Sequence, residues 1–401
     1  MAFLYVNSKG TPWRKHSYSA GNTFDQCPMK YYTQKILGWK EKDNLARFQY
    51  GKAIEETVQF HHEHNGEGTR EFFQKRWLLE KDKPLQYTKV EKDWETLAKN
   101  GDEHIRLYII RQPSLPIPMG GQTLFQREYS KEVFPGDPNY GEIEDAGKLD
   151  IVAYVDPSHP MLPKLDWKPE YGAFRPLIVD MKAMAADLPE AYGIVAYDTQ
   201  LRRYSWQSGI RDVALLGFIK KARSLQKGSS VTLLEDSGTF KAGQEAVIAQ
   251  VEKEGETVWL LANDFMIEEM EKAQGKKPDG KTDQTNAAKE RRQKWLEEFG
   301  TKTHEGFVTK QRLQFNAGYV TIESANEAGM IAARQIVNIV NAWHSKQWPN
   351  TFGIRYPHDD RQDPYFRAFV LKDEAFKNLN FTKSDEETLD DLFADGTEDE
   401  Q

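Results

Sequence analysis

Two aspartates and a lysine stand where apolar runs of the chain could bring them together. Asp150 lies in the run GKLDIVAY, residues 147–154, and Asp180 closes the run LIVD, residues 177–180, with Lys182 two positions further on. Both runs have the apolar, β-branched composition of strands. If the two strands pair in one sheet, the carboxylates meet at one site, where like charges raise each other's pKa unless a cation neutralises them.

A hard divalent cation suits such a pair of carboxylates. Mg²⁺ and Mn²⁺ prefer oxygen ligands, and Mg²⁺ needs only one or two protein carboxylates beside its waters. Because side chains alternate along a strand, Lys182 shares a face with Asp180, and its ammonium can reach a metal-bound water or a phosphate. This set suits phosphodiester hydrolysis, since the metal acidifies its water and neutralises the developing charge. The alternative is two strand ends that meet solvent.

Composition bounds the class of protein. The 401 residues are 39% apolar and 29% charged, as in soluble globular proteins, and are enough for a sizeable core. No run of about 18 apolar residues appears and the N-terminus lacks a secretory apolar segment, so we expect neither membrane insertion nor export. The single cysteine, Cys27, cannot form an internal disulfide and suits a reducing cytoplasm.

The net charge of −8 is unevenly distributed. The tail from Ser384 to Gln401 holds nine acids and no base, and without it 54 basic residues face 53 acidic ones, so a nucleic-acid partner is not excluded. Basic clusters could bind phosphates, with solvated helix faces as the alternative. They are Arg202 and Arg203, the group Lys220, Lys221 and Arg223, and residues 289–294.

Periodicity predicts an α/β fold with a mixed central β-sheet flanked by helices. Strands are expected at 122–134, 146–156, 177–182, 212–222 and 312–323, and helices at 16–32, 45–66, 196–210 and around Ile336, Ile339, Val340 and Trp343. The expected parts are a core at 1–223, an antiparallel β insertion at 224–264, a charged helical or flexible segment at 265–304, the closing strand and helix of the core at 305–380, and a disordered acidic tail at 381–401.

These motifs together resemble a known family. GKLD followed by LIVDMK is similar to the metal site of the PD-(D/E)xK nucleases, and the flanks resemble the RecB-type branch, which includes CRISPR-associated adaptation nucleases and recombination exonucleases. SYSAGNTFDQCPMKYY resembles that branch's opening helix, YGKAIEE its glycine-plus-ligand helix, DTQLRRY its Gln-x-x-x-Tyr helix, and IVNAWHSKQWPN its late helix and Pro-Asn turn. The resemblance implies a restriction-endonuclease-like core and Mg²⁺- or Mn²⁺-dependent cleavage of DNA.

The resemblance also implies roles for single residues. Asp150 and Asp180 would bind the metal, with the carbonyl of Met181 as a further ligand, and Lys182 would position or activate the water. In YGKAIEE a glutamate, Glu55, stands where the branch often has histidine, which leaves the choice between Glu55 and Glu56 open.

Gln200 and Tyr204, four residues apart, would share the helix face that borders the site and the DNA. An ordinary helix surface is the alternative. Arg202 and Arg203 on the same helix are expected to add contacts to DNA phosphates.

Three other motifs carry weaker expectations. Many members of the branch bind an iron–sulfur cluster through four cysteines, but Cys27 is the only cysteine here, so we expect no cluster and a buried helix residue. Gly275 to Thr282 matches the phosphate-loop pattern, yet a polar helical pattern precedes it, so we expect no nucleotide. His61, His62, Glu63 and His64 could bind zinc, although a solvated helix end is favoured.

The leading hypothesis is a metal-dependent DNA nuclease, an exonuclease acting on DNA ends or single strands in recombination, repair or replication. The alternative is a DNA-binding subunit that is inactive without a partner; a nucleotide-dependent switch would need the Gly275 motif. The acidic tail could compete with DNA for basic residues, or dock a recombination, replication or single-strand-binding protein through Leu392 and Phe393.

Overall fold

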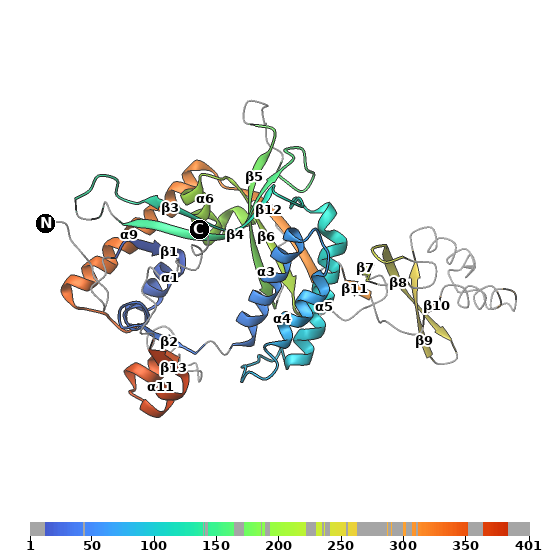
Figure 1. Ribbon diagram of the computed structural model, residues 1–401, viewed down its shortest axis with the longest axis horizontal. Helices are drawn as coiled ribbons and strands as arrows, with labels where there is room; N and C mark the ends of the chain where they lie inside the picture. The colour runs from blue at the N-terminus through green and yellow to red at the C-terminus, as the bar shows by residue number, and fades with distance from the viewer. Residues whose placement is uncertain are drawn as a thin grey trace, which may run out of the picture.

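A mixed β-sheet forms the centre of the computed structural model of the protein (Figure 1). The structure describes residues 13–42, 45–138, 140, 143–163, 172–185, 187–188, 193–221, 230–234, 236, 241–253, 256–262, 287, 290, 300–301, 307–309, 312–351 and 364–383. Within these residues the sheet has six strands: β1 (Lys15–Ser17), β3 (Thr123–Glu132), β4 (Glu144–Val155), β5 (Arg175–Met184), β6 (Asp212–Ile219) and β12 (Leu313–Tyr319).

The order of these strands is β1-β4-β5-β6-β12, and β3 pairs with the other edge of β4. β5 runs parallel to β6 and β1 parallel to β4, whereas the pairs β3–β4, β4–β5 and β6–β12 are antiparallel. Every residue of β6 is buried, as expected for a central strand covered on both faces. The predicted α/β class with a mixed sheet is therefore confirmed.

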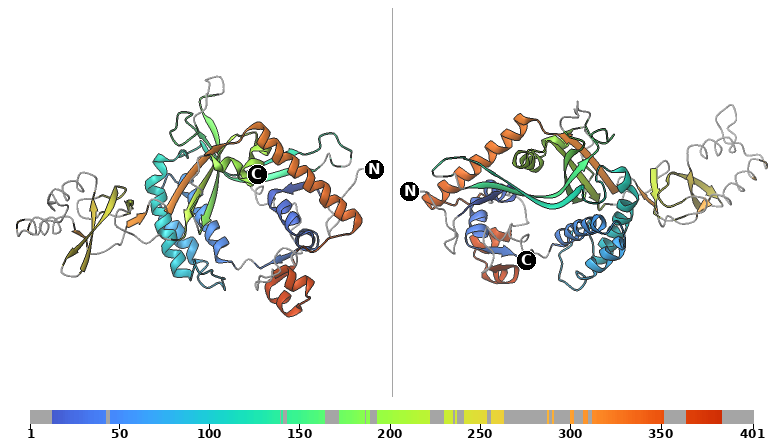
Figure 2. Two further views of the ribbon diagram at one scale, coloured as in Figure 1. Left: turned by 180° about the vertical axis from the view of Figure 1, so that it is seen from behind. Right: turned by 45° about the horizontal axis from the view of Figure 1, so that its top comes forward.

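Helices cover both faces of this sheet (Figure 2). One face carries α3 (Ala46–Glu63), α4 (Thr69–Leu78) and α5 (Trp94–Arg111); the other carries α6 (Thr199–Ser208), with α9 (Ile322–Ser345) packed against it. Leu177 and Val179 of β5 pack into the core with α3 and α5, whereas Ile178 packs into the core with α6. Alternation along a strand therefore divides β5 between two apolar cores, as a sheet covered on both faces requires.

The N-terminal helices differ in detail from the sequence prediction. They are α1 (Tyr18–Gln26), α2 (Pro28–Tyr31) and the π-helical turn η1 (Tyr32–Ile36). Ser17 caps α1, because its extended backbone lets the side chain accept from the N–H of Ala20. Cys27 is buried, but it lies between α1 and α2 rather than within a helix. Trp348 stacks on Tyr32 with ring centroids 5.0 Å apart, which ties these helices to the segment after α9.

The remaining elements lie outside the central sheet. Among the residues described, an antiparallel sheet has the order β10-β9-β8-β7-β11 and projects beyond α5 in Figure 1. Its strands are β7 (Ser230–Leu233), β8 (Glu245–Lys253), β9 (Glu256–Ala262), β10 (Gly300–Thr301) and β11 (Phe307–Thr309). The alternating stretch predicted as a β insertion supplies β7, β8 and β9; the sequence did not predict β10 and β11.

Near the C-terminal end of the described chain, β13 (Phe381–Lys383) pairs antiparallel with β2 (Trp39–Glu41), and Phe381 is buried. The predicted start of the disordered tail at residue 381 is therefore wrong for these three residues. Short helical elements complete the fold: η2 (Gln112–Ser114), η4 (Ile194–Tyr197), η6 (Phe366–Val370) and α11 (Glu374–Asn380). Across the ranges described, no helix combines the length and apolar character needed to cross a membrane. The Gly275–Thr282 motif and the tail from Ser384 lie outside the described residues, so nucleotide binding and the tail's role stay predictions.

Candidate active site

Asp150 and Asp180 lie where β4 and β5 separate in the central sheet, and we call this point the fork. The ladder between β4 and β5 ends with Ile151 opposite Val179, and the next pair in that register is Asp150 opposite Asp180. Beyond this point β5 continues beside β6, whereas the first residues of β4 pair with β1. The N–H of Met181 turns to the side chain of Asp150 and donates to Oδ2 at 2.8 Å. The fork therefore places the two acids opposite each other, as the sequence predicts for paired strands.

Lys182 lies on Asp180, as their spacing on one strand face predicts. Its Nζ is 2.7 Å from Oδ2 and 2.9 Å from Oδ1 of Asp180. The Asp180 side chain is 2% exposed, whereas that of Lys182 is 42% exposed. The ammonium therefore neutralises a buried carboxylate from the solvent side, where it can also meet a bound molecule.

The two-stranded ribbon formed by β3 and β4 reverses the direction in which its faces point beside Asp150. Gln126 has a left-handed backbone in the middle of β3, with φ of 53°, and the ladder has no pair between Gln126 and Asp150. Ile151 packs in the core on the α3 side, whereas Leu149 packs in the core on the α6 side. Residues two apart in a regular strand share a face, so the ribbon reverses its faces at Asp150.

Helix α3 supplies a third acid to the site. The Gln126 amide donates to Glu55 Oε1, and the Glu55 carboxyl is close enough to Asp180 and Asp150 for charge repulsion. Its neighbour Glu56 instead forms an ion pair with Arg76 of α4. The structure therefore favours Glu55 in the choice that the sequence left open.

The three carboxyl groups disfavour each other's ionisation. Burial, and then repulsion from Asp150, raise the pKa of Asp180 to about 7, although Lys182 opposes the shift. Burial, and then repulsion from Glu55, raise the pKa of Asp150 to about 6. Burial also raises the pKa of Glu55. A site with this excess of acid favours binding of a cation, because a positive charge stabilises the ionised carboxylates.

The chemistry of the donor set fits a hard divalent cation, since it offers three carboxylates. In the geometry observed, no three His, Cys, Asp or Glu side chains of the described residues converge closely enough to hold one ion. Glu55 is turned to Gln126, and Asp180 is turned to Lys182. A cation at this site would therefore compete with these two partners for the carboxylate oxygens.

A cavity of about 690 Å³ opens beside the acids. Glu55 and Lys182 line it, whereas Asp150 and Asp180 do not. The lining also includes three more cationic side chains, those of Arg47, Lys52 and Lys148. Four cationic side chains thus line the cavity with two acids, Glu55 and Glu56, and this excess of positive charge suits an anionic polymer whose reacting group must come close to carboxylates.

Helix α6 brings Tyr204 and Gln200 to the other side of Asp180. Asp198 caps the helix by accepting from the N–H groups of Gln200 and Leu201, both at 2.9 Å. The amide of Gln200 donates to Tyr204 Oη at 2.6 Å. Burial raises the pKa of Tyr204, and repulsion from the nearby Asp180 carboxylate adds to the shift. The face predicted to border the site does lie against Asp180, while its contact with DNA stays a prediction.

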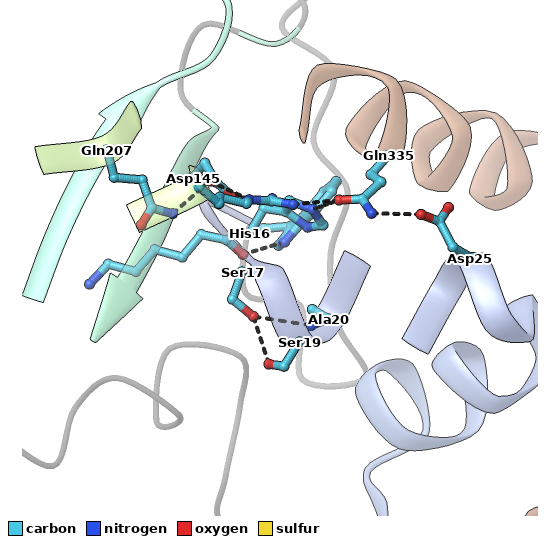
Figure 3. Close-up of polar contacts among 11 residues, drawn as sticks. His16, Ser17, Ser19, Ala20, Asp25, Asp145, Gln207 and Gln335 are labelled. Atoms are coloured by element: carbon cyan, nitrogen blue, oxygen red, sulfur yellow. Dashed lines mark hydrogen bonds and ion pairs between the residues drawn. The ribbon is translucent and has the colours of Figure 1, made fainter. Parts of the chain in front are cut away.

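Arg203 does not belong to a DNA-binding surface. Its side chain is 2% exposed; Nε donates to Asp145 Oδ2 at 2.6 Å, and Nη1 donates to Gln335 Oε1 at 2.6 Å. Figure 3 shows Asp145, Gln207, Gln335 and Asp25 in one chain of polar contacts across β4, α6, α9 and α1. The expectation for Arg203 is therefore corrected: its guanidinium is used inside the protein.

Arg202 is also used within the fold. Its guanidinium donates to the carbonyl of Ser324 at 2.8 and 3.1 Å and to Glu327 at 2.5 Å, all at the start of α9. Its side chain is 14% exposed. Helix amphipathicity alone could not reveal these partners, since Asp145 lies 58 positions from Arg203, and Glu327 lies 125 positions from Arg202.

The histidine-rich end of α3 is not the solvated terminus that the sequence favoured. His61 and His62 are buried; His61 Nδ1 is 3.0 Å from Thr69 Oγ1, and His62 Nε2 is 2.7 Å from Tyr108 Oη. His64 is exposed and stacks on Phe60. His61 and His62 therefore connect α3 to the start of α4 and to α5. Among the residues that the structure describes, they are not part of a group of three side chains that could hold a metal ion.

Gln126 is the site residue that sequence reasoning missed. The strand pattern of β3 gives no sign of its left-handed backbone, which is uncommon for a residue other than glycine. The partner strand gives no sign of it either, because Leu149 and Ile151 keep the period of two on either side of Asp150. Comparison of the chain with models of known protein families gives no match, and a search of curated proteins gives none either.

Proposed function

We propose that the protein is a metal-dependent DNA nuclease that hydrolyses phosphodiester bonds at DNA ends or in single strands. One observation carries the proposal: Asp150 and Asp180 oppose each other at the fork of the sheet, with Lys182 on the second acid and a cation-lined cavity beside them. Acids with raised pKa values suit a metal, and the surrounding cations suit phosphates. The resemblance of the sequence to the PD-(D/E)xK nucleases supports the same assignment.

Each residue of the site would have its own role in phosphodiester hydrolysis. Asp150, Asp180 and Glu55 would hold Mg²⁺ or Mn²⁺, and the carbonyl of Met181 is a further candidate ligand. The metal, when bound, supplies Lewis acidity toward the phosphate and toward a water. Lys182 would orient the attacking water or the scissile phosphate through its ammonium. Lys52 and Lys148 at the cavity wall would hold neighbouring phosphates.

The test is cleavage of end-labelled single-stranded, double-stranded and circular DNA by purified protein with Mg²⁺ or Mn²⁺. The wild type should cut at least one linear form, and Asp180→Ala should abolish cutting while DNA binding persists. Asp156→Ala is the matched control, because this exposed aspartate follows the far end of β4 and its carboxylate accepts hydrogen bonds from Ser158, away from the site. Intact DNA in every wild-type reaction would refute the proposal.

A second function is favoured by one observation. No three His, Cys, Asp or Glu side chains of the described residues converge closely enough to hold one ion, and Asp180 and Glu55 are bonded to Lys182 and Gln126 instead. A DNA-binding subunit that cuts only with a partner would have this property. In that case the wild type binds DNA but leaves it intact, and Asp180→Ala changes neither result.

A further inference from the structure

The wall of the cavity formed by α3 contains residues that have no role in the proposed metal site. Along α3, Phe48, Gly51 and Glu55 follow each other at spacings of three and four, so they share one helix face, and all three line the cavity. The Phe48 side chain is 54% exposed. A half-exposed aromatic ring at the wall of a cavity is available to a flat ligand group.

Gly51 leaves the middle of this cavity wall without a side chain. A Cβ added at Gly51 would have no heavy atom within 4 Å, so no packing neighbour requires glycine there. Glycine inside a helix costs about 0.5–1 kcal/mol relative to alanine. Gly51 therefore leaves the wall without a side chain between Phe48 and Glu55, and we call this part of the cavity the passage.

The charges along the passage select an anionic chain. The Arg47 guanidinium carbon lies 5.0 Å from the centroid of the Phe48 ring. Lys52 and Lys148 line the same cavity, and both side chains are exposed. Aromatic rings and guanidinium planes bind the faces of nucleobases, while lysines hold the phosphates between them.

We infer that this wall binds single-stranded DNA, with one base stacked on Phe48 and Arg47 and the sugar-phosphate backbone passing Gly51 toward Glu55. The inference rests on the proposed nuclease function and names its substrate. Phe48 precedes Glu55 by about 10 Å along the helix axis, at 1.5 Å per residue. At 3.4 Å per stacked nucleotide, this places the stacked base about three nucleotides from the acids. Internal bases of a duplex expose no face, so the wall discriminates against intact double strands.

The first experiment measures DNA binding by fluorescence anisotropy without divalent metal, using a labelled single-stranded oligonucleotide and the matching blunt duplex. Phe48→Ala should weaken single-strand binding about tenfold and change duplex binding less than twofold, since stacking acts on unpaired bases. Phe48→Trp should restore binding. Phe174→Ala is the control, because that phenylalanine is 47% exposed but does not line the cavity.

The second experiment separates the passage from helix stability. Gly51→Ala should raise or preserve the melting temperature, because alanine favours helix and meets no neighbour, yet it should weaken single-strand binding. Equal single-strand affinity of wild type, Phe48→Ala and Gly51→Ala would overturn the inference. Equal losses on single strands and duplex would also overturn it, since they would indicate charge attraction without stacking.

Cleavage assays tell the two proposals apart. If the wild type cuts DNA but Phe48→Ala cuts single strands at the wild-type rate, the proposed stacking of a base on Phe48 is wrong and the nuclease assignment stands. If the wild type cuts nothing while Phe48→Ala still loses single-strand binding selectively, the wall is correct and the nuclease assignment fails.

Discussion

Asp145 and Asp150 lie on the same strand, β4, but they have opposite electrostatic surroundings. Asp145 faces the guanidinium of Arg203 and accepts a further hydrogen bond from Gln207 at 2.6 Å. Asp150 faces another carboxylate, that of Asp180. The ammonium of Lys182 forms its ion pair with Asp180 and not with Asp150. One acid has a cation of its own, whereas two acids share one cation at the fork.

This difference separates a structural charge from a reactive one. A buried acid with a dedicated bidentate partner is fixed in place, and removal of the partner leaves an uncompensated charge in the core. Acids that repel each other store unfavourable free energy, which a bound cation releases. β4 therefore stabilises the fold near Asp145 and offers chemistry near Asp150. Four predictions test this contrast.

The largest effect is expected at Lys182. Under the proposed function, Lys182→Ala should lower the DNA cleavage rate by about 10²- to 10⁴-fold, because a group that orients or activates the water acts mainly in the transition state. The measurement is single-turnover cleavage of end-labelled DNA at saturating protein. Lys83→Ala is the control, since this lysine is 54% exposed and pairs with Glu80 at the end of α4. A loss of less than fivefold at Lys182 would show that the lysine is not part of the reaction.

Arg203→Ala should cost about 3–5 kcal/mol of the free energy of unfolding, because Asp145 would remain buried without its cation. Urea denaturation followed by tryptophan fluorescence measures this change. Arg203→Lys should restore only part of the loss, since an ammonium cannot form the paired contact. Wild-type stability of Arg203→Ala would mean that the network is not structural.

Asp180→Asn should stabilise the protein at pH 8 in the presence of a chelator. The pKa of this acid is raised from 3.8 to about 7 in the folded protein, so its destabilising effect is absent below about pH 4, grows between pH 4 and 7, and is complete above pH 7. The difference between 3.8 and about 7 limits the expected gain in the free energy of unfolding to about 4 kcal/mol at pH 8, and the gain shrinks toward zero near pH 4.

Thermal denaturation of both proteins at pH 4, 6 and 8 measures this dependence. Comparison at each pH cancels the contributions of titrating groups that do not interact with Asp180, while its neighbours Asp150, Glu55 and Lys182 respond to the change. A gain that is constant with pH would show that ionisation of Asp180 is not its cause.

The smallest effect is expected at Arg202. Arg202→Ala should cost less than about 1 kcal/mol of the free energy of unfolding, because its partner Glu327 is 60% exposed and solvent weakens the pair. DNA affinity should stay within twofold of the wild type, since the guanidinium is directed at α9. A strong loss of DNA binding would return Arg202 to the binding surface that the sequence suggested.

The sequence determined the elements and the local order of the acids. β5 forms over residues predicted from the apolar run LIVDMK, because β-branched residues favour strands whatever their partners are. The spacing of Asp180 and Lys182 fixes their common face through the strand period of two. The α9 stripe of Ile336, Ile339 and Val340 is buried, as helical spacing predicts.

Only the tertiary structure decided which charges are paired. Arg202 and Arg203 are neighbours with identical chemistry, yet one reaches α9 at the surface and the other reaches Asp145 in the core. Gln126 meets Glu55 because the β3–β4 ribbon reverses at Asp150. These partners come from segments far apart in the chain, and periodicity describes only neighbours within one element. The energy of a buried charge depends on such distant partners, so the sequence places the acids on strands while the fold determines which of them remain reactive.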